Sequence, residues 1–235
     1  MTLSATDPHA PKELPTLGLF GGRFDPVHRA HVAMAQAAAD QLGLSEVRWL
    51  VTAAPVHKPA VASPAQRFEM VRLALDELGD DRMVADDREI TLAQGGQANP
   101  TWVTIESLQR DDPGRRLVWL MGEDQLQAFA TWHRWEWLVK NMALAVCARP
   151  GAGEAASSSA NLERRDGEEQ PGKAPQQSTL GHAPPGAHIL PVAFAADAVS
   201  SSQVRAAIAK GDSIDGLVPA GVARYLAAHN VYGAA

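Results

Sequence analysis

Two histidines three residues apart, His28 and His31, follow a glycine pair and an Asp-Pro step in the stretch GGRFDPVHRAH, residues 21–31. The apolar residues 17–20 before it favour a buried strand, and the alanine-rich residues after it favour a helix. Glycines let backbone N–H groups approach an anion, and a helix start adds unpaired N–H donors and a partial positive charge. At this spacing both imidazoles lie on one face of the first helical turn and can hydrogen-bond phosphate oxygens. The stretch therefore predicts a phosphate site.

A second stretch with similar chemistry, SSSQVR, occupies residues 200–205. A run of hydroxyl side chains before a helix caps it, and the same hydroxyl and N–H groups can hold phosphate oxygens. Arg205 falls in the first turn of that helix, where its guanidinium could bind phosphate with two parallel hydrogen bonds.

Composition narrows the class of protein. The 235 residues suit one α/β domain with a sizeable core. A formal net charge of −6 argues against a dedicated nucleic-acid binder, which normally shows a basic face. A lone Cys147 rules out a disulfide framework within the chain and suits a reducing, cytoplasmic location. No apolar run approaches the length of about 18 residues that a membrane span needs, so no membrane partner is expected. The oligomeric state stays open.

Short apolar runs alternate with helical patterns along the chain, without hairpin signals. This order predicts a single Rossmann-like α/β domain, a parallel sheet with helices on both faces. The expected strands cover residues 17–20, 47–52, 83–85, 116–121, 143–148 and 188–192; the expected helices cover residues 28–42, 101–109, 132–141 and 203–210, with two more starting near Pro64 and Pro219. Ligands of such sheets bind at the carboxyl ends of the strands, where Gly21, Gly22 and residues 55–58 and 122–124 fall.

Two segments are expected to lie outside this fold. Residues 1–15 carry prolines and charges without an apolar core and read as a flexible N-terminal tail. The nucleotide-binding domain is expected over residues 16–235, interrupted at residues 151–186 by a disordered insertion that is rich in Ser, Gln and Pro and has almost nothing to bury.

Residues 21–31 resemble the phosphate-binding signature of the HxGH nucleotidyltransferase superfamily, GGTFDPxHxGH. Nine of the eleven positions match; Arg23 stands where Thr is usual and Ala30 where Gly is usual. Residues 200–205 resemble the second signature of the same superfamily, ISSTxIR. The two motifs occur in the expected order at opposite ends of the chain.

The middle of the chain resembles bacterial nicotinate-nucleotide adenylyltransferases. The segments that carry this resemblance are residues 55–58, 87–90, 122–124, 131–133, 147–151 and 217–219. The resemblance implies that nicotinate mononucleotide and ATP react to nicotinate adenine dinucleotide and pyrophosphate, with Mg²⁺ carried on the nucleotide and no metal site in the protein. In that family the segment after the D-x-R-E-like stretch reads PSYTIDTL; here residues 100–108 carry one extra residue, and Thr104 is the expected substrate contact.

The resemblance also implies roles for individual residues. The catalytic residues would be His28, His31 and Arg205, which stabilise charge on the phosphates. The ATP-binding residues would be Gly21, Gly22, Phe24, His28, His31, Gly122, Asp124, Ser200, Ser201, Ser202 and Arg205. The residues that bind the mononucleotide would be Asp25, His57, Lys58, Thr104, Trp132 and Arg149, with Trp132 stacked on the pyridine ring.

Other interpretations of the same residues remain open at this point. The two histidines could cap a helix or bind a metal, the glycines could only form a tight turn, and Arg205 could be a solvated charge. Trp132 could belong to the core with Trp135 and Trp137, and residues 87–89 could be a structural ion-pair cluster. For the whole chain, the alternatives are a phosphopantetheine adenylyltransferase or cytidylyltransferase, a silent nucleotide-binding sensor that Arg23 would suit, and, more distantly, a nucleic-acid-binding module.

Overall fold

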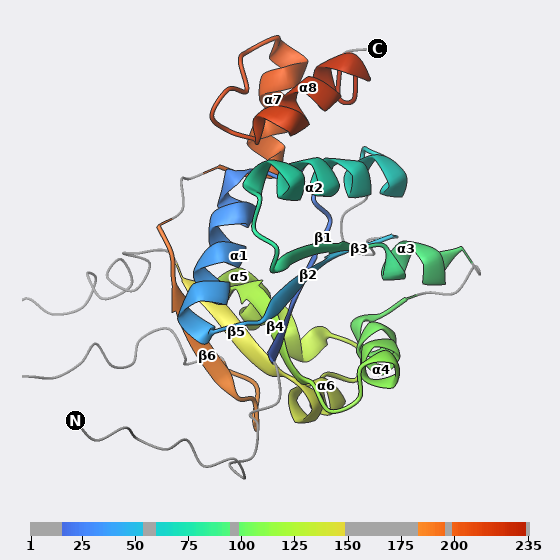
Figure 1. The fold of residues 1–235 in the computed structure, drawn as a ribbon, viewed down its shortest axis with the longest axis vertical. Helices are drawn as coiled ribbons and strands as arrows, with labels where there is room; N and C mark the ends of the chain where they lie inside the picture. The colour runs from blue at the N-terminus through green and yellow to red at the C-terminus, as the bar shows by residue number, and fades with distance from the viewer. Residues whose placement is uncertain (1–15, 54–59, 95–98, 149–182, 196–198, 234–235) are drawn as a thin grey trace, which may run out of the picture.

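Six parallel strands form one sheet in the order β3-β2-β1-β4-β5-β6 (Figure 1). The computed structural model describes residues 16–53, 60–94, 99–148, 183–195 and 199–233. The strands are β1 (Thr16–Gly22), β2 (Glu46–Val51), β3 (Met83–Asp86), β4 (Arg116–Gly122), β5 (Ala143–Ala148) and β6 (Ile189–Ala193). The prediction of a Rossmann-like parallel sheet is confirmed, and all six expected strands are present.

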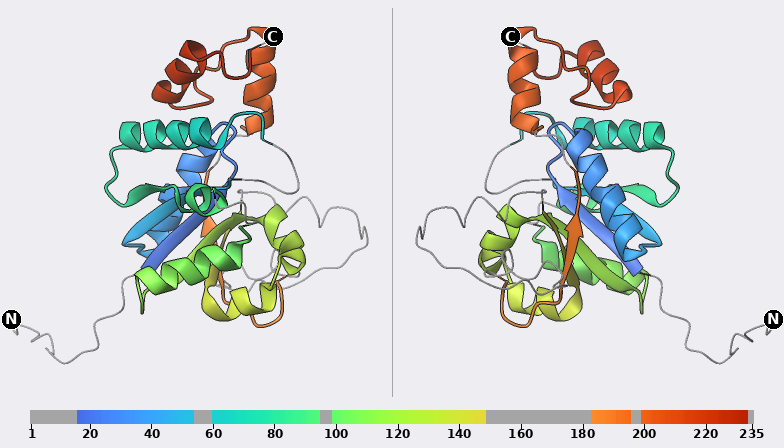
Figure 2. Two further views of the ribbon diagram at one scale, coloured as in Figure 1. Left: turned by 90° about the vertical axis from the view of Figure 1, so that its right-hand side faces the viewer. Right: turned by 90° about the vertical axis from the view of Figure 1, so that its left-hand side faces the viewer.

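Helices cover both faces of this sheet. They are α1 (Arg29–Leu42), α2 (Pro64–Leu78), α3 (Arg88–Ala93), α4 (Thr101–Asp111), α5 (Glu123–Ala128), η1 (Phe129–Thr131), α6 (Trp135–Asn141), α7 (Ser201–Lys210) and α8 (Ala220–Ala228). In Figure 2, α4 faces the viewer on the left and α1 faces the viewer on the right, because they lie on opposite faces. None of the described helices is long and apolar enough to cross a membrane.

Side chains of β1 point alternately into two separate cores, as the period of a strand requires. Leu17 and Leu19 pack with α4, α5 and α6, whereas Phe20 packs with α1, α2, α7 and α8. Both strand faces are apolar, because a sheet covered on both sides leaves no position facing water.

Local sequence signals set the ends of several helices. The Ser63 hydroxyl accepts the N–H of Gln66 at 3.2 Å, and Pro64 occupies the first position of α2. Gly43 ends α1 with a φ of 60°, a left-handed conformation that suits glycine. These starts and stops agree with the sequence predictions.

Some helical segments differ from the sequence predictions. Helix α3 and the short η1 have no apolar periodicity of their own and were not predicted. Helix α5 begins where the sequence indicates a strand-to-helix junction, at residues 122–124, but it is only six residues long. The helix predicted over residues 132–141 begins only at Trp135, because Trp132 is extended and Arg134 has a φ of 58°.

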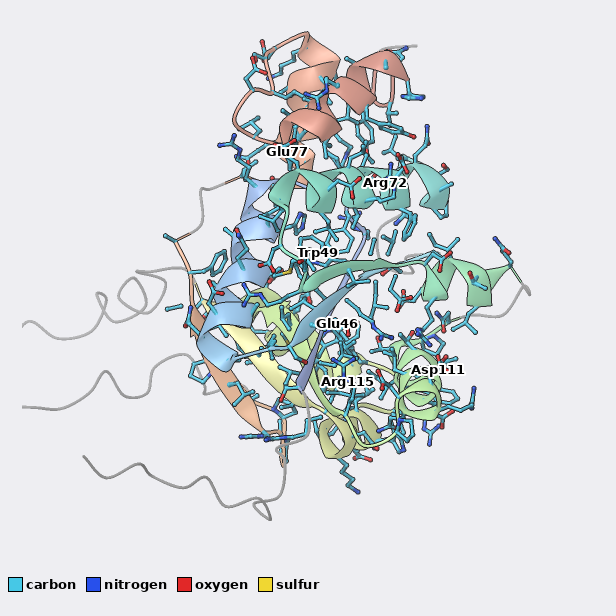
Figure 3. The ribbon with its side chains drawn as sticks, viewed as in Figure 1. Glu46, Trp49, Arg72, Glu77, Asp111 and Arg115 are labelled. Atoms are coloured by element: carbon cyan, nitrogen blue, oxygen red, sulfur yellow. The ribbon has the colours of Figure 1, made fainter. Side chains whose placement is uncertain are left out.

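Ion pairs join α3 to α4, and the loop after α4 to β2. Arg88 of α3 lies 2.6 Å from the carboxylate of Asp111 in α4, and Arg115 lies 2.8 Å from Glu46 of β2; Asp111, Arg115 and Glu46 are labelled in Figure 3. The interpretation of residues 87–89 as a structural ion-pair cluster therefore holds for Arg88.

The two C-terminal helices lie beyond α2, away from the middle of the sheet (Figure 1). Glu77 of α2 accepts the N–H groups of Ala220 and Gly221, at 3.0 and 2.7 Å, and so caps the start of α8 (Figure 3). The last turn of the chain is thereby held beside the loop between β1 and α1, where Tyr232 contacts Asp25.

Gly21 packs against an aromatic ring, which predicts a cost for adding a side chain. A Cβ atom on Gly21 would lie only 2.4 Å from the Trp119 ring, a distance that requires the ring or the backbone to move. We expect Gly21→Ala to lower the free energy of unfolding by about 1–3 kcal/mol, the usual cost of overpacking, in urea denaturation. Gly221→Ala is the control, since its Cβ would lie at an ordinary 3.5 Å from its neighbours. Equal stability of the two variants would contradict the prediction.

Candidate nucleotide-binding site

A cavity of about 530 Å³ lies at the carboxyl ends of β1, β4 and β5. Strands β1 and β4 are neighbours in the sheet although other elements separate them in the chain, so the strand order reverses between them. Open α/β sheets bind ligands at such a crevice. Its described lining residues are Phe20, Gly21, Gly22, Arg23, Phe24, His28, Ala30, His31, Met34, Gly122, Glu123, Asp124, Gln125, Cys147, Phe194, Val199, Ser200 and Ser201.

Two helix N-termini meet at this cavity. His28 is the N-cap of α1 and Ser200 is the N-cap of α7, and both residues line the cavity. The Ser201 hydroxyl donates to the Pro26 carbonyl at 2.9 Å, which ties the start of α7 to the loop before α1. Each helix start adds N–H donors and partial positive charge, so the pair favours an anion. The structure thus brings together the two predicted phosphate motifs.

The glycines at this site make room for neighbouring side chains. A Cβ on Gly22 would lie 2.8 Å from the Phe24 ring, and one on Gly122 would lie 2.7 Å from the Asp124 carboxylate. Phe24 itself is buried and has a φ of 48°, so the loop turns sharply there. The glycines therefore permit close packing as well as access of a ligand to the backbone.

The His31 imidazole is neutral and offers a hydrogen-bond donor at Nε2. Burial, and next the charge of His28, hold the pKa of His31 well below its usual value of 6.5. The His31 Nδ1 accepts the backbone N–H of His28 at 3.2 Å, so in the neutral ring the proton is on Nε2. The two imidazole rings are stacked with their centroids 3.6 Å apart. Such close stacking disfavours a positive charge on both rings at once.

Arg205 contacts the loop between β1 and α1, and Ser202 contacts Arg205. One guanidinium nitrogen of Arg205 donates to the Asp25 carbonyl at 2.6 Å, and another donates to the Ser202 hydroxyl at 3.3 Å. Neither residue is part of the cavity lining in this conformation. Their predicted contacts with phosphate stay predictions.

Asp25 joins segments of the protein that are far apart in sequence. Its carboxylate is 1 % exposed and accepts hydrogen bonds from the N–H groups of Val61 and Ala62, at 2.9 and 3.0 Å, and from the Tyr232 hydroxyl at 2.7 Å. These contacts give Asp25 a structural role; its predicted contact with the mononucleotide stays a prediction.

Thr104 is fully buried and pairs with Glu89, a residue that the sequence analysis assigned to a possible ion-pair cluster at residues 87–89. The Thr104 hydroxyl donates to Glu89 at 3.0 Å. Burial raises the pKa of Glu89 to about 7, against the opposing hydrogen bonds from Thr104 and Thr52. Thr104 therefore lies in a buried polar cluster outside the cavity, and its contact with substrate stays a prediction.

Trp132 is not part of the cavity lining, but it contacts Trp119, which packs against Gly21 of the lining. Its ring meets that of Trp119 edge-on, with centroids 5.8 Å apart, and Trp119 in turn contacts Gly21. The ring centroids of Trp132 and Phe129 lie 5.0 Å apart. Trp132 is half-buried against the apolar core beneath α4, α5 and α6. The structure thus supports its membership of the aromatic cluster, and stacking on a pyridine ring stays a prediction.

Three further predicted site residues, His57, Lys58 and Arg149, lie outside the described residues. The same holds for residues 1–15 and for residues 151–182 of the predicted insertion. Residues 183–186 at the end of that segment are described: they form a turn with Pro184 buried, and the Ala187 N–H donates to the Pro184 carbonyl at 3.1 Å.

Arg67 is a site-supporting residue that the sequence did not reveal. Its guanidinium is completely buried and donates to backbone carbonyls. The acceptors are Arg23 and Thr52 at 2.8 Å, and Ala53 and Ala62 at 3.2 Å. Arg67 therefore fixes the loop after β1 and the end of β2 together. An arginine in the first turn of a helix gives no local signal of such burial.

The fold and the site define a class of protein. Residues 19–207 match the model of the cytidylyltransferase-like family, and the chain belongs to this family. A solved structure of Plasmodium falciparum nicotinic acid mononucleotide adenylyltransferase, complexed with NaAD, has the same fold: the TM-score is 0.68 at 16 % identity, over 93 % of this chain and 97 % of that one.

Relatives narrow the family further. A Bordetella petrii protein named probable nicotinate-nucleotide adenylyltransferase is 37 % identical over 92 % of this chain and 98 % of its own. A Neisseria meningitidis protein of the same name is 36 % identical over the same shares. Within its class, the chain is a member of the nicotinate-nucleotide adenylyltransferase family.

The buried Glu89 predicts a pH-dependent stability. Its pKa of about 7 in the folded state exceeds its ordinary value of 4.5, so the folded state favours the neutral acid. Between these two values only the unfolded chain releases the proton, and stability therefore falls as pH rises. Between pH 4.5 and pH 8 we expect the free energy of unfolding of the parent protein to fall by about 3 kcal/mol through this group. The Glu89→Gln variant should not show this decrease.

The measurement is chemical denaturation across this pH range. His31 has a lowered pKa and acts in the opposite sense, but it is present in both proteins and cancels in their difference. Glu136→Gln, at an exposed position in α6, is the control. Parallel curves for the parent and Glu89→Gln would contradict the prediction.

Proposed function

We propose that the protein transfers the adenylyl group of ATP to nicotinate mononucleotide and releases pyrophosphate. The observation that carries this proposal is the meeting of both phosphate motifs at one cavity, although they lie about 170 residues apart in sequence. The names of the relatives at 36–37 % identity support the choice of substrates. The structure in complex with NaAD, whose fold this chain shares, carries the product of the same reaction.

The reaction needs no protein nucleophile. A phosphate oxygen of the mononucleotide attacks the α-phosphorus of ATP, a new P–O bond forms, and the bond from the α-phosphorus to the bridging oxygen breaks. The electron pair leaves with pyrophosphate. Catalysis then consists of positioning and charge stabilisation.

His31 is the residue best placed to stabilise the transferring phosphate. Its Nε2–H is available as a donor because Nδ1 is already bonded to the His28 backbone. The N-termini of α1 and α7 add donors and partial charge on two sides of the same cavity. Arg205 would bind the β- and γ-phosphates after exchanging its contact with the Asp25 carbonyl.

Mg²⁺ would enter as part of the ATP complex. Among the described residues, no group of three or more His, Cys, Asp or Glu side chains comes together to hold a metal ion. Glu123 and Asp124 line the cavity, and their oxygen atoms suit a hard cation that is held mainly by phosphates. When bound, Mg²⁺ would offset part of the phosphate charge.

The substrate is tested by pyrophosphate release with ATP and Mg²⁺. Nicotinate mononucleotide, nicotinamide mononucleotide and phosphopantetheine are offered in parallel. We expect turnover with nicotinate mononucleotide. Turnover with phosphopantetheine alone would assign the protein to another branch of the superfamily, and ATP binding without any turnover would favour a nucleotide sensor.

The role of His31 is tested by His31→Ala. We expect pyrophosphate release to fall by about 100-fold or more, the usual loss on removing one donor to a developing charge, while ATP binding stays within a few-fold. His188→Ala is the matched control. His188 is exposed and directly precedes β6, so it lies at the amino ends of the strands, whereas the cavity lies at their carboxyl ends. Turnover of His31→Ala at the level of the control would refute the assigned role.

A further inference from the structure

We propose that Arg23 binds the phosphate groups of a substrate and supplies the one permanent positive charge among the described lining residues of the cavity. This inference rests on the proposed function and goes beyond it, since the superfamily signature has Thr at this position. Arg23 directly follows β1, is half-buried, and lines the cavity together with His28 and His31.

The charges around the cavity carry the argument. Of the described lining residues, Glu123 and Asp124 are acidic, and His31 is neutral because burial, and next the charge of His28, lower its pKa. Besides Arg23, His28 is therefore the other basic side chain of the described lining that contributes positive charge. Arg23 is the only lysine or arginine among the described lining residues. ATP remains an anion when it carries Mg²⁺, and so does the mononucleotide. Without Arg23, these two anionic substrates would bind beside the carboxylates of Glu123 and Asp124 with less positive charge to offset the repulsion.

The backbone of Arg23 is held in place by a hydrogen bond from Arg67. The buried Arg67 donates to the Arg23 carbonyl at 2.8 Å, and the next residue, Phe24, is buried as well. The direction in which the Arg23 side chain leaves the loop is therefore fixed, which lowers the entropy cost of using it as a ligand.

The two arginines also repel each other. Burial is the largest effect on the pKa of Arg67 and lowers it, whereas Asp25 and Tyr232 raise it. The charge of Arg23 lowers this pKa by a smaller amount, so the two guanidinium groups lie within electrostatic reach of one another. A phosphate anion bound by Arg23 would relieve this repulsion.

Arginine also changes the geometry of recognition relative to threonine. A threonine hydroxyl donates one hydrogen bond, whereas a guanidinium can donate two parallel bonds to phosphate and keeps its charge at every relevant pH. We expect the contact to act on phosphate binding more than on the chemical step.

The test is Arg23→Thr, which restores the usual residue of the signature. We expect the KM of one substrate to rise about tenfold or more, as for loss of a hydrogen bond to a charged group, with kcat changed only a few-fold. A rise in the KM of ATP assigns the contact to the triphosphate, and a rise in the KM of nicotinate mononucleotide assigns it to the phosphomonoester. The rise of that KM with salt should also be less steep in the variant.

Arg29→Thr is the matched control. It removes the same charge from an exposed position in the first turn of α1 that is not part of the cavity lining. Arg23→Lys keeps the charge but not the paired donors, so its KM should lie between those of the parent and Arg23→Thr. KM values of Arg23→Thr within twofold of the Arg29→Thr values, for both substrates, would overturn the proposal.

Direct binding separates this proposal from the proposed function. Calorimetry with inorganic pyrophosphate and with inorganic phosphate needs no turnover and measures the anion site alone. Weaker binding of either anion by Arg23→Thr than by Arg29→Thr supports the role of Arg23 even if no substrate is turned over. Equal binding of both anions by the two variants overturns it, whatever the activity of the parent protein.

Discussion

The buried carboxylate of Asp25 is the contact on which the site depends. It accepts hydrogen bonds from the start of α2 and from Tyr232 near the end of the chain, and its backbone carbonyl accepts a hydrogen bond from Arg205 of α7. Burying a carboxylate without hydrogen-bond donors costs free energy of folding. The segments that supply the donors therefore stabilise one another through Asp25. One residue of the phosphate loop thus links the segment before α2, helix α7 and the last turn of the described chain.

Arg67 complements this arrangement with the opposite charge. Its guanidinium is surrounded by carbonyl groups from the loop after β1, the end of β2 and the segment before α2. Asp25 acts on it electrostatically and partly offsets the cost of its burial. Two buried charges therefore hold the loops at the carboxyl edge of the sheet, and a site built in this way needs little reorganisation when phosphate groups bind.

The sheet order explains why residues from both ends of the chain share one cavity. Strands β1 and β4 are neighbours, and their helices leave toward opposite faces, so the crevice between them is open. Helix α7 reaches this crevice from the far end of the sequence and adds the second helix N-terminus. On the face of the sheet that α4, α5 and α6 cover, Trp119 contacts Gly21, and Trp132 packs against Trp119. The aromatic cluster therefore lies next to the site.

The sequence by itself determined the strands, the longer helices, their caps and the two phosphate motifs, because each depends on apolar periodicity or on residues a few positions apart. It also indicated the family through those motifs. Only the tertiary structure decided the burial of Arg67 and Glu89, the direction of Arg205, and the short helix α3. Those features depend on partners that the fold supplies: the Arg67 acceptor in the β1 loop is 44 residues away, and the Asp25 carbonyl is 180 residues from Arg205. Local propensity carries no information about such pairings, so a buried arginine reads in the sequence like any solvated one.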